Sequence, residues 1–301
     1  MTKLELYNKL NIEVNSMKKK GKVIIINNQY VSKPMSRKSN FYEYLQTRNF
    51  NYFPNIYSDI SDDIELMDYI EEKEIPDEQK LEDIIYLASI LHLSTTFVKN
   101  VDLDKIKEIY ENTIDRIDRL FNYYNEMQNM IEEEIYMSPA NYLLIRNISD
   151  IYKCLNLSKD YINDWYKEKE NNKTIRYVYT HSNLRKEHLL ENDKMYLISW
   201  DNSKIDMPIK DIEIVYRNSF YDIDIFNLLN IYEKKYPLKK EEKFLLFSYL
   251  LIPIDITFSE NEFIKTEQIT ELVEYQKKIL ESLENYSKET NNNTYKQNKD
   301  K

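Results

Sequence analysis

The stretch YTHSNLRKEHLLENDKMYLISWDNSKIDMP, residues Tyr179–Pro208, decides how this sequence is interpreted. A short extended segment leads into polar residues, and an apolar burst, MYLISW, follows and is closed by acids and a proline. A short apolar run bounded by turn residues is typical of a buried strand. The stretch therefore predicts a polar loop followed by a buried strand, and the question is which chemistry its polar side chains can perform.

The composition of the whole chain limits the classes of function. The chain has 301 residues, of which 42% are hydrophobic, enough for a sizeable core in one large domain or two small lobes. Its formal net charge is −10, and an acidic surface repels phosphate backbones, so no nucleic-acid partner is expected. The one cysteine, Cys154, excludes an intramolecular disulfide framework and a multi-cysteine zinc site. This usage fits a reducing cytoplasm.

Apolar runs and glycine content exclude further classes. The longest apolar run, FLLFSYLLIPI over Phe244–Ile254, is too short for a membrane span and contains Pro253, so we expect a buried helix and no membrane partner. The N-terminal MTKLELYNKLN lacks the apolar core of a signal peptide. Gly21 is the one glycine in the sequence, which excludes Walker and dinucleotide-binding loops because they need several glycines.

The N-terminal residues 1–75 are predicted to form a small, mostly antiparallel sheet with helices. An amphipathic helix is predicted over Leu4–Met17, and the basic cluster Lys18–Lys22 is expected to be a solvated turn at Gly21. The two β-rich runs of KVIIINNQYVSKP, separated by NNQ, predict a hairpin. A helix is predicted over Ser36–Asn49, and YFPNIYSDISDDIELMDYIEE predicts two more strands around a polar turn.

The remaining residues, 76–286, are predicted to be mostly helical. Asp77–Phe97 is apolar on most faces and should be a central helix. Leu103–Met137 has apolar residues at helical spacing and should be a long amphipathic helix. Residues 287–301 have little apolar surface to bury, which predicts a disordered tail. Other helices are predicted to begin near Ser138, Ser158, Asp222, Lys239 and Thr266, the first of them ending near Leu155.

This order of elements resembles a bilobal protein-kinase-like fold of the α+β class, with a small antiparallel-sheet N-lobe and a larger helical C-lobe. The closer resemblance is to the aminoglycoside phosphotransferase and choline kinase family, especially its spore-coat-associated kinase-like branch. It covers roughly residues 20–285 through short motifs.

The resemblance implies nucleotide-binding positions in the N-terminal part. The strand YVSKP looks like the one that carries the phosphate-binding lysine, here Lys33. The helix FYEYLQTRNF looks like the one whose acid, here Glu43, holds that lysine in an ion pair. On spacing alone, Lys33 could be an exposed strand lysine and Glu43 an ordinary surface acid. The strand IELMDYIEE resembles the hinge that meets adenine, which implies contacts from Met67, Asp68, Tyr69 and Ile70.

The catalytic loop of the resembled family reads H-G-D-x-x-x-x-N. Here the first three positions are His181, Ser182 and Asn183. Asn183 stands at the position of the catalytic base, and an amide cannot accept the proton of a substrate hydroxyl at useful pH. His181 is the residue that orients the loop backbone in the family, so a structural role is expected for it.

The metal positions of the family are also altered. His188 replaces the asparagine that ends the loop motif, and Ser199 replaces the principal Mg²⁺ ligand of the I-D-W/F-D/E strand, here Ile198–Asp201. Hard Mg²⁺ binds nitrogen poorly, and a serine hydroxyl is a weak neutral ligand. Asp201 could act as an auxiliary ligand, and His188 could instead be a hydrogen-bonded loop histidine.

Two further positions are implied to be structural. The segment DMPIKDIEIVY resembles the family's D-P-x-x-D-L-A motif, in which Asp211 would be a buried aspartate that braces the catalytic loop. Asp206 is expected to be a turn residue. His92 occupies a structural position in the helix that packs beneath the hinge.

These losses lead to the hypothesis of a pseudokinase, a kinase fold that serves as a binding or structural module and needs no cofactor. The resemblance would place it in the cytoplasm or with the spore, with a protein partner in a coat or other assembly. The alternative is an ATP-dependent small-molecule phosphotransferase that acts on a hydroxyl and uses ATP and Mg²⁺ with Asp201 as metal ligand. A third hypothesis is a sensor that binds ATP without metal. The substrate, partner identity and oligomeric state cannot be predicted.

Overall fold

The structure is a computed structural model that describes residues 13–34, 39–57, 64–254 and 256–297. The chain divides into two compact units that are interleaved along the sequence. The first comprises Met1–Phe97 and Tyr177–Val215, and the second comprises Val98–Arg176 and Tyr216–Lys301. The stretch Tyr179–Pro208 therefore packs in the same unit as the N-terminal strands. The lobe boundaries predicted at residues 75 and 286 stay predictions.

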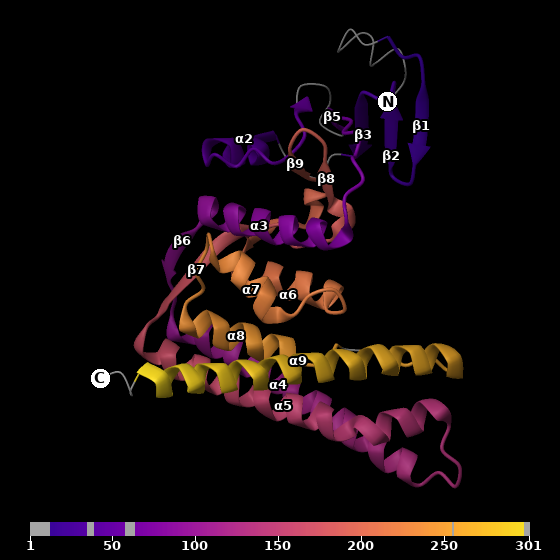
Figure 1. The fold of residues 1–301 in the computed structure, drawn as a ribbon, viewed down its shortest axis with the longest axis vertical. Helices are drawn as coiled ribbons and strands as arrows, with labels where there is room; N and C mark the ends of the chain where they lie inside the picture. Colours follow the sequence, from indigo (N-terminus) through magenta and orange to yellow (C-terminus); the bar gives the residue numbers. More distant parts are fainter. Residues whose placement is uncertain (1–12, 35–38, 58–63, 255, 298–301) are drawn as a thin grey trace. The chain divides into compact units, whose positions relative to one another are not determined.

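An antiparallel five-stranded sheet forms the N-terminal part of the first unit, in the order β1-β2-β3-β5-β4 (Figure 1). The strands are β1 (Met17–Lys20), β2 (Val23–Ile26), β3 (Tyr30–Pro34), β4 (Ile56–Tyr57) and β5 (Ile64–Asp68). The predicted β2–β3 hairpin is confirmed. The basic cluster Lys18–Lys22 forms much of β1 as well as the predicted turn, in which Gly21 has a φ of +60°. Two-residue hairpin turns favour glycine at a first position with positive φ. The helix predicted over Leu4–Met17 lies mostly outside the described residues, and Met17 itself begins β1.

The alternation of side chains gives this sheet two different faces. One face carries a small core of Ile26 and Leu66, both fully buried, against which Met17, Ile24 and Tyr57 pack. The opposite face carries the intervening residues and lines a pocket. The residues of this pocket face are Lys20, Val23, Ile25, Val31, Lys33 and Met67.

Two helices of the first unit confirm the sequence prediction. Helix α2 (Ser39–Thr47) lies within the predicted 36–49, and α3 (Asp77–Thr95) within the predicted 77–97. Buried residues occur on most sides of α3, as its nearly continuous apolar sequence predicts. The buried face of α2 consists of Phe41, Tyr42 and Leu45.

The stretch Tyr179–Pro208 folds into short elements. They are η1 (Lys186–His188), β8 (Leu189–Glu191), β9 (Met195–Leu197), η2 (Trp200–Asn202) and β10 (Lys204–Asp206), and β8 pairs with β9 as a hairpin. The predicted buried strand MYLISW is a strand only as far as Leu197. It stops because Ser199 adopts a left-handed φ of 64°, after which the buried Trp200 begins η2. The indole Nε1 of Trp200 donates a hydrogen bond to the carbonyl of Leu197 at 2.9 Å, which fixes this bend.

Long helices make up most of the second unit. They are α4 (Leu103–Glu132), α5 (Pro139–Asn171), α7 (Ile225–Glu233), α8 (Lys240–Leu251) and α9 (Glu262–Gln297). Three further elements, β6 (Phe97–Asn100), β7 (Thr174–Thr180) and α6 (Ile209–Ser219), contain residues of both units. The predicted cap at Ser138 is confirmed, since its hydroxyl accepts a hydrogen bond from the N–H of Asn141 at 3.3 Å.

The predicted helix boundary near Leu155 and Ser158 is wrong. Helix α5 continues through both residues, and Ser158 is a fully buried position within it. Its hydroxyl donates to the carbonyl of Ser248 in α8 at 2.8 Å. A serine that resembles an N-cap in sequence therefore acts as a polar contact between helices.

Helix α9 runs on to Gln297, past residue 287, where the sequence analysis places the start of a disordered tail. Residues 298–301 lie outside the described part of the chain. Helix propagation costs little once a helix is anchored, and α9 is anchored by buried residues as far as Leu283. None of the helices in the described ranges is long and apolar enough to cross a membrane. The antiparallel sheet and the mostly helical remainder confirm the predicted α+β class.

Candidate functional site

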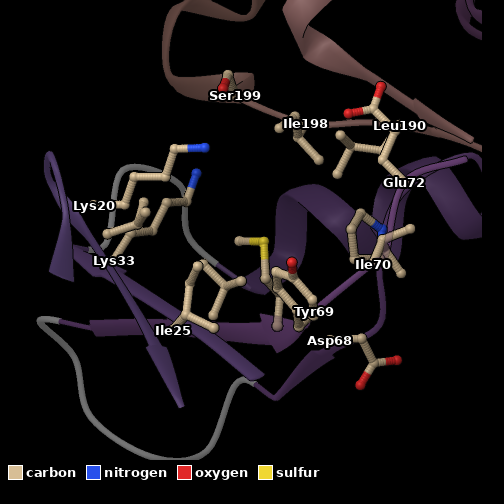
Figure 2. Close-up of a pocket in the computed structure, with 14 residues that line it drawn as sticks. Lys20, Ile25, Lys33, Asp68, Tyr69, Ile70, Glu72, Leu190, Ile198 and Ser199 are labelled. Carbon is tan, nitrogen blue, oxygen red and sulfur yellow. The ribbon is translucent and has the colours of Figure 1, made fainter. Parts of the chain in front are cut away.

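A cavity of about 270 Å³ lies on the pocket face of the sheet (Figure 2). It is lined by the sheet, by Pro54 before β4, by the segment that follows β5, and by Leu190 of β8 with Ile198 and Ser199. The size is near the lower end of ordinary small-molecule pockets, which begin at about 300 Å³. Of the residues predicted to bind a nucleotide or metal, the lining includes Lys33, Met67, Asp68, Tyr69, Ile70 and Ser199.

Lys33 is held between two carboxylates. Its Nζ lies 3.5 Å from Oε2 of Glu65 and 3.1 Å from Oδ1 of Asp201. Lys33 and Glu65 stand directly opposite each other in the β3–β5 ladder, where facing side chains are close enough to interact. Tyr42 of α2 donates a hydrogen bond to the other oxygen of Glu65 at 2.6 Å, in a buried position.

The predicted Lys33–Glu43 ion pair is therefore replaced by a Lys33–Glu65 pair. Glu43 is exposed, because the buried face of α2 is formed by its neighbours Phe41, Tyr42 and Leu45. One signal in the sequence could have identified Glu65: it is an acid within a strand that is otherwise mostly apolar, IELM, and such an acid needs a cation or hydrogen-bond donor.

Met67, Asp68, Tyr69 and Ile70 line the pocket, and their backbone is partly hydrogen-bonded; their contact with adenine stays a prediction. The N–H of Tyr69 donates to the carbonyl of Gln29 at 2.8 Å. The carboxylate of Asp68 accepts hydrogen bonds from Asn55 at 2.7 Å and from Tyr57 at 2.8 Å. The hydrogen bond to Asp68, together with burial, raises the pKa of Tyr57 to about 12.

Asp211 braces the loop that follows β7, as the resemblance implies. It is 0% exposed, and its Oδ2 accepts from the backbone N–H of His181 at 2.8 Å while Oδ1 accepts from that of Ser182 at 2.7 Å. The ring of His92 adds a third contact at 3.0 Å to Oδ2. Burial alone would raise the pKa of Asp211, but the hydrogen bond to His92 and the nearby donors hold that pKa below its usual range. Asp211 is therefore a charged acceptor within the core.

His181 connects this loop to the stretch before η2. Its Nε2 lies 2.9 Å from the carbonyl of Ile198, so Nε2 carries the proton and donates. Burial lowers the pKa of His181 to about 4, which keeps the ring neutral at physiological pH. A neutral, buried ring suits the predicted role in orienting the loop.

Asn183 and His188 contact each other at the end of the loop. The Nδ1 of His188 donates to the backbone carbonyl of Asn183 at 2.6 Å. His188 thus has the hydrogen bond of a loop histidine, and both side chains are half-buried. They do not line the pocket, whereas Ser199 does.

Two serines of the site adopt left-handed backbone conformations. The φ of Ser182 is 58° and that of Ser199 is 64°. For a residue other than glycine, this conformation costs about 1 kcal/mol. The resemblance implies a glycine at the position of Ser182, and a positive φ is a conformation that glycine adopts without strain. At Ser199 the turn directs Asp201, whose side chain is 52% exposed, toward Lys33.

The donor atoms of the site do not fit a divalent cation. Within the described ranges, no group of three or more histidine, cysteine, aspartate or glutamate side chains could hold a metal ion. Asn183 and Ser199 supply only neutral oxygen, and the carboxylate of Asp201 is already bound to the ammonium group of Lys33.

The sheet, the hinge and the braced loop define a kinase-like α+β fold. The structure is similar to that of an aminoglycoside phosphotransferase from Alicyclobacillus acidocaldarius, with a TM-score of 0.70, 11% identity, and coverage of 96% of this chain and 97% of that chain. A glucosamine kinase matches with a TM-score of 0.53 and 8% identity, covering 94% of this chain and 79% of that chain. At such low identities the likeness shows the fold alone.

A spectinomycin phosphotransferase solved with ADP and spectinomycin has the same fold, with a TM-score of 0.51 and 10% identity over 92% of this chain and 97% of that chain. No protein-family model matches the sequence, and no curated protein is similar to it. The spore-coat-associated branch stays a prediction.

Proposed function

We propose that this chain binds an adenine nucleotide in the pocket of the first unit and does not transfer its phosphoryl group. The observation that carries this proposal is the composition of the pocket: Lys33 and residues 67–70 line it together with the neutral Ser199. Asn183, in the loop after β7, is neutral as well, and the resemblance implies an acid at both positions. The chain would then be a nucleotide-binding pseudokinase. A protein partner in a coat or other assembly remains a prediction.

The pocket offers what a nucleotide base requires. Val23, Val31, Leu190 and Ile198 provide apolar surface for a planar ring. The backbone N–H and carbonyl of Ile70 make no hydrogen bond with another of the described residues, so they can pair with the edge of a base. Two structures with this fold, the spectinomycin phosphotransferase and the glucosamine kinase, were solved with ADP, which supports a nucleotide as the ligand class.

The loop offers little of what phosphoryl transfer requires. A hydroxyl acceptor must lose its proton, and the amide of Asn183 cannot take it. Charge on the transferring group must be neutralised, which is the largest electrostatic task in this chemistry, and Ser199 cannot hold the cation that usually performs it. Positioning of the loop by Asp211 and His181 does not replace either contribution.

A second candidate is a phosphotransferase in which Asp201 holds Mg²⁺. The observation that favours it is the position of Asp201, half-exposed and 3.1 Å from the ammonium group of Lys33. Asp201 would have to release Lys33 to bind a cation. It would also act without a second acid from the loop, so this candidate explains less of the site.

Calorimetric titration of the purified full chain with ATP and with ADP, each with Mg²⁺ and with EDTA, tests the proposal. Saturable binding is expected, weakened at least tenfold by Lys33→Met, while ADP release stays at the no-enzyme level with glucosamine, spectinomycin or choline as acceptor. Lys33→Met leaves Glu65 without its cation, so the double variant Lys33→Met/Glu65→Gln is measured beside it. No binding under any condition, or turnover that Lys33→Met abolishes, would overturn the proposal.

A further inference from the structure

We propose that Lys20 and Lys33 together neutralise the phosphates of the nucleotide in place of a divalent cation. The ligand of the site is then a metal-free nucleoside diphosphate or triphosphate. This inference rests on the proposed function, which supplies the nucleotide. It adds the chemical form of the ligand and assigns a role to Lys20, which the sequence analysis placed in a solvated turn.

The register of the sheet places Lys20 in the pocket. Lys20 is paired with Val23 across the β1–β2 hairpin, and facing residues of a ladder share one side of a sheet. Both line the cavity together with Lys33. In Figure 2 the side chains of Lys20 and Lys33 extend toward the wall that carries Ser199, and Asp68 lies at the other end of the view. The two lysines therefore mark one end of the pocket as cationic.

The two lysines differ in how much of their charge is already compensated. Lys33 is only 12% exposed and is bonded to both Glu65 and Asp201. Lys20 is exposed and pairs with no carboxylate in the described part of the chain. Lys33 can thus fix the position of a phosphate, whereas Lys20 supplies positive charge that is not yet used.

Other sources of phosphate recognition are scarce at this end of the pocket. The β1–β2 turn contains the one glycine of the chain, Gly21, so the backbone cannot form a glycine-rich cradle of N–H donors. The turn has two residues between Lys20 and Val23, too short to fold over a triphosphate. Side-chain ammonium groups are the donors that remain.

The neutral residues Asn183 and Ser199 favour the same ligand. An aspartate at position 183 or 199 would repel phosphate oxygens unless a cation stood between them. Ser199 in the pocket wall and Asn183 in the loop outside it are neutral and exert no such repulsion, so a cation is not needed to hold the nucleotide. A Mg²⁺ ion that arrived with ATP would instead lie beside two ammonium groups and without a set of acidic ligands.

Titration of the full chain with ADP in EDTA and in excess Mg²⁺ tests this inference. The dissociation constant in EDTA is expected to be equal to or lower than that in Mg²⁺. Lys20→Ala should raise the metal-free value about tenfold, and Lys20→Arg should restore most of the affinity. Lys19→Ala is the matched control: it removes the same charge from the same exposed strand, but its side chain lies on the opposite face, so a change below twofold is expected.

Adenosine, which has no phosphate, separates the charge of Lys20 from the shape of the pocket. Its affinity should be the same for the native chain and Lys20→Ala. Equal effects of Lys20→Ala and Lys19→Ala on ADP, or binding that requires Mg²⁺, would overturn the inference and leave the nucleotide proposal standing. Failure of ADP and adenosine to bind the native chain would overturn both.

Discussion

The buried support of the loop after β7 and the neutral residues Asn183 and Ser199 of the same unit differ in burial and in charge. Asp211 receives two backbone N–H groups and the ring of His92; Asp211, His181 and His92 are fully buried, and the N–H of Ser182 is half-buried. Asn183 in the loop and Ser199 in the pocket wall are half-buried and neutral. The shape of the loop and the charge at its surface are therefore maintained by different residues.

Folding energetics explain why the shape of the loop and the charge at its surface can depend on different residues. A buried carboxylate with no water must keep its donors, since an unpaired buried charge costs several kcal/mol. An acid at the surface of a pocket has no such requirement, and its replacement by an amide or hydroxyl costs the fold little. The fold can thus retain a braced loop whether or not the loop still performs chemistry.

The largest expected effect is the loss of folding stability when Asp211, which braces the loop, is replaced. Asp211→Asn keeps the size of the side chain but removes the charge and one acceptor oxygen from three donors. We expect the free energy of unfolding in urea to fall by about 3 kcal/mol. Asp206→Asn is the control in the same segment; Asp206 pairs with Lys204 near the surface, so a loss below about 1 kcal/mol is expected.

The same variant has a distinct dependence on pH. The folded-state pKa of Asp211 is lowered, so its contribution to stability is present above the unfolded value of about 3.9 and is lost as the pH falls below it. The native chain should lose more stability than Asp211→Asn between pH 5 and the acid limit of the transition. Parallel curves for the two proteins would show that the charge of Asp211 does not brace the loop.

The second expected effect comes from placing negative charge at positions 183 and 199. The double variant Asn183→Asp/Ser199→Asp restores two acids without touching Asp211. Repulsion of phosphate should weaken metal-free ADP binding about tenfold, or about 1.4 kcal/mol, and Mg²⁺ should now strengthen binding. Calorimetric titration measures both values. Asn192→Asp/Asn202→Asp adds the same charge at exposed positions and should leave the affinity within twofold.

The features that the sequence predicts correctly depend on interactions between residues that are close together in the chain. The β2–β3 hairpin and the N-cap at Ser138 follow from patterns of a few neighbours, and the structure places them as predicted. The bracing role of Asp211 is predicted from a short motif, and it involves a single loop. The β1 strand was missed because four lysine and methionine residues resemble a polar turn until β2 pairs with them.

The partners of Lys33 could not be predicted from local pattern. Glu65 is its cross-strand neighbour only because β5 lies beside β3, and β4 and a helix intervene in the sequence. Tyr42, one residue before Glu43, turns the buried face of α2 toward Glu65 and leaves Glu43 in solvent. A difference of one position on a helix is about 100° of rotation, more than an unaligned motif can resolve.

The smallest expected effect tests that assignment. Glu65→Gln keeps an acceptor for Tyr42 but leaves Lys33 with Asp201 as its remaining carboxylate. We expect a loss of about 1 kcal/mol in the free energy of unfolding, because a charged hydrogen bond becomes a neutral one and Asp201 compensates in part. Glu43→Gln is the matched control on an exposed helix face, with an expected change below about 0.3 kcal/mol.

The two glutamate variants also sharpen the comparison between support and chemistry. If Glu65 only fixes the position of Lys33, then Glu65→Gln should change ADP affinity less than Lys20→Ala does, since Lys33 keeps its charge and one partner. Equal effects of Glu43→Gln and Glu65→Gln on both stability and affinity would show that the strand acid is not the residue that holds Lys33. In that case Lys33 would be a replaceable residue of the pocket, and the buried Glu65 would not fix its position.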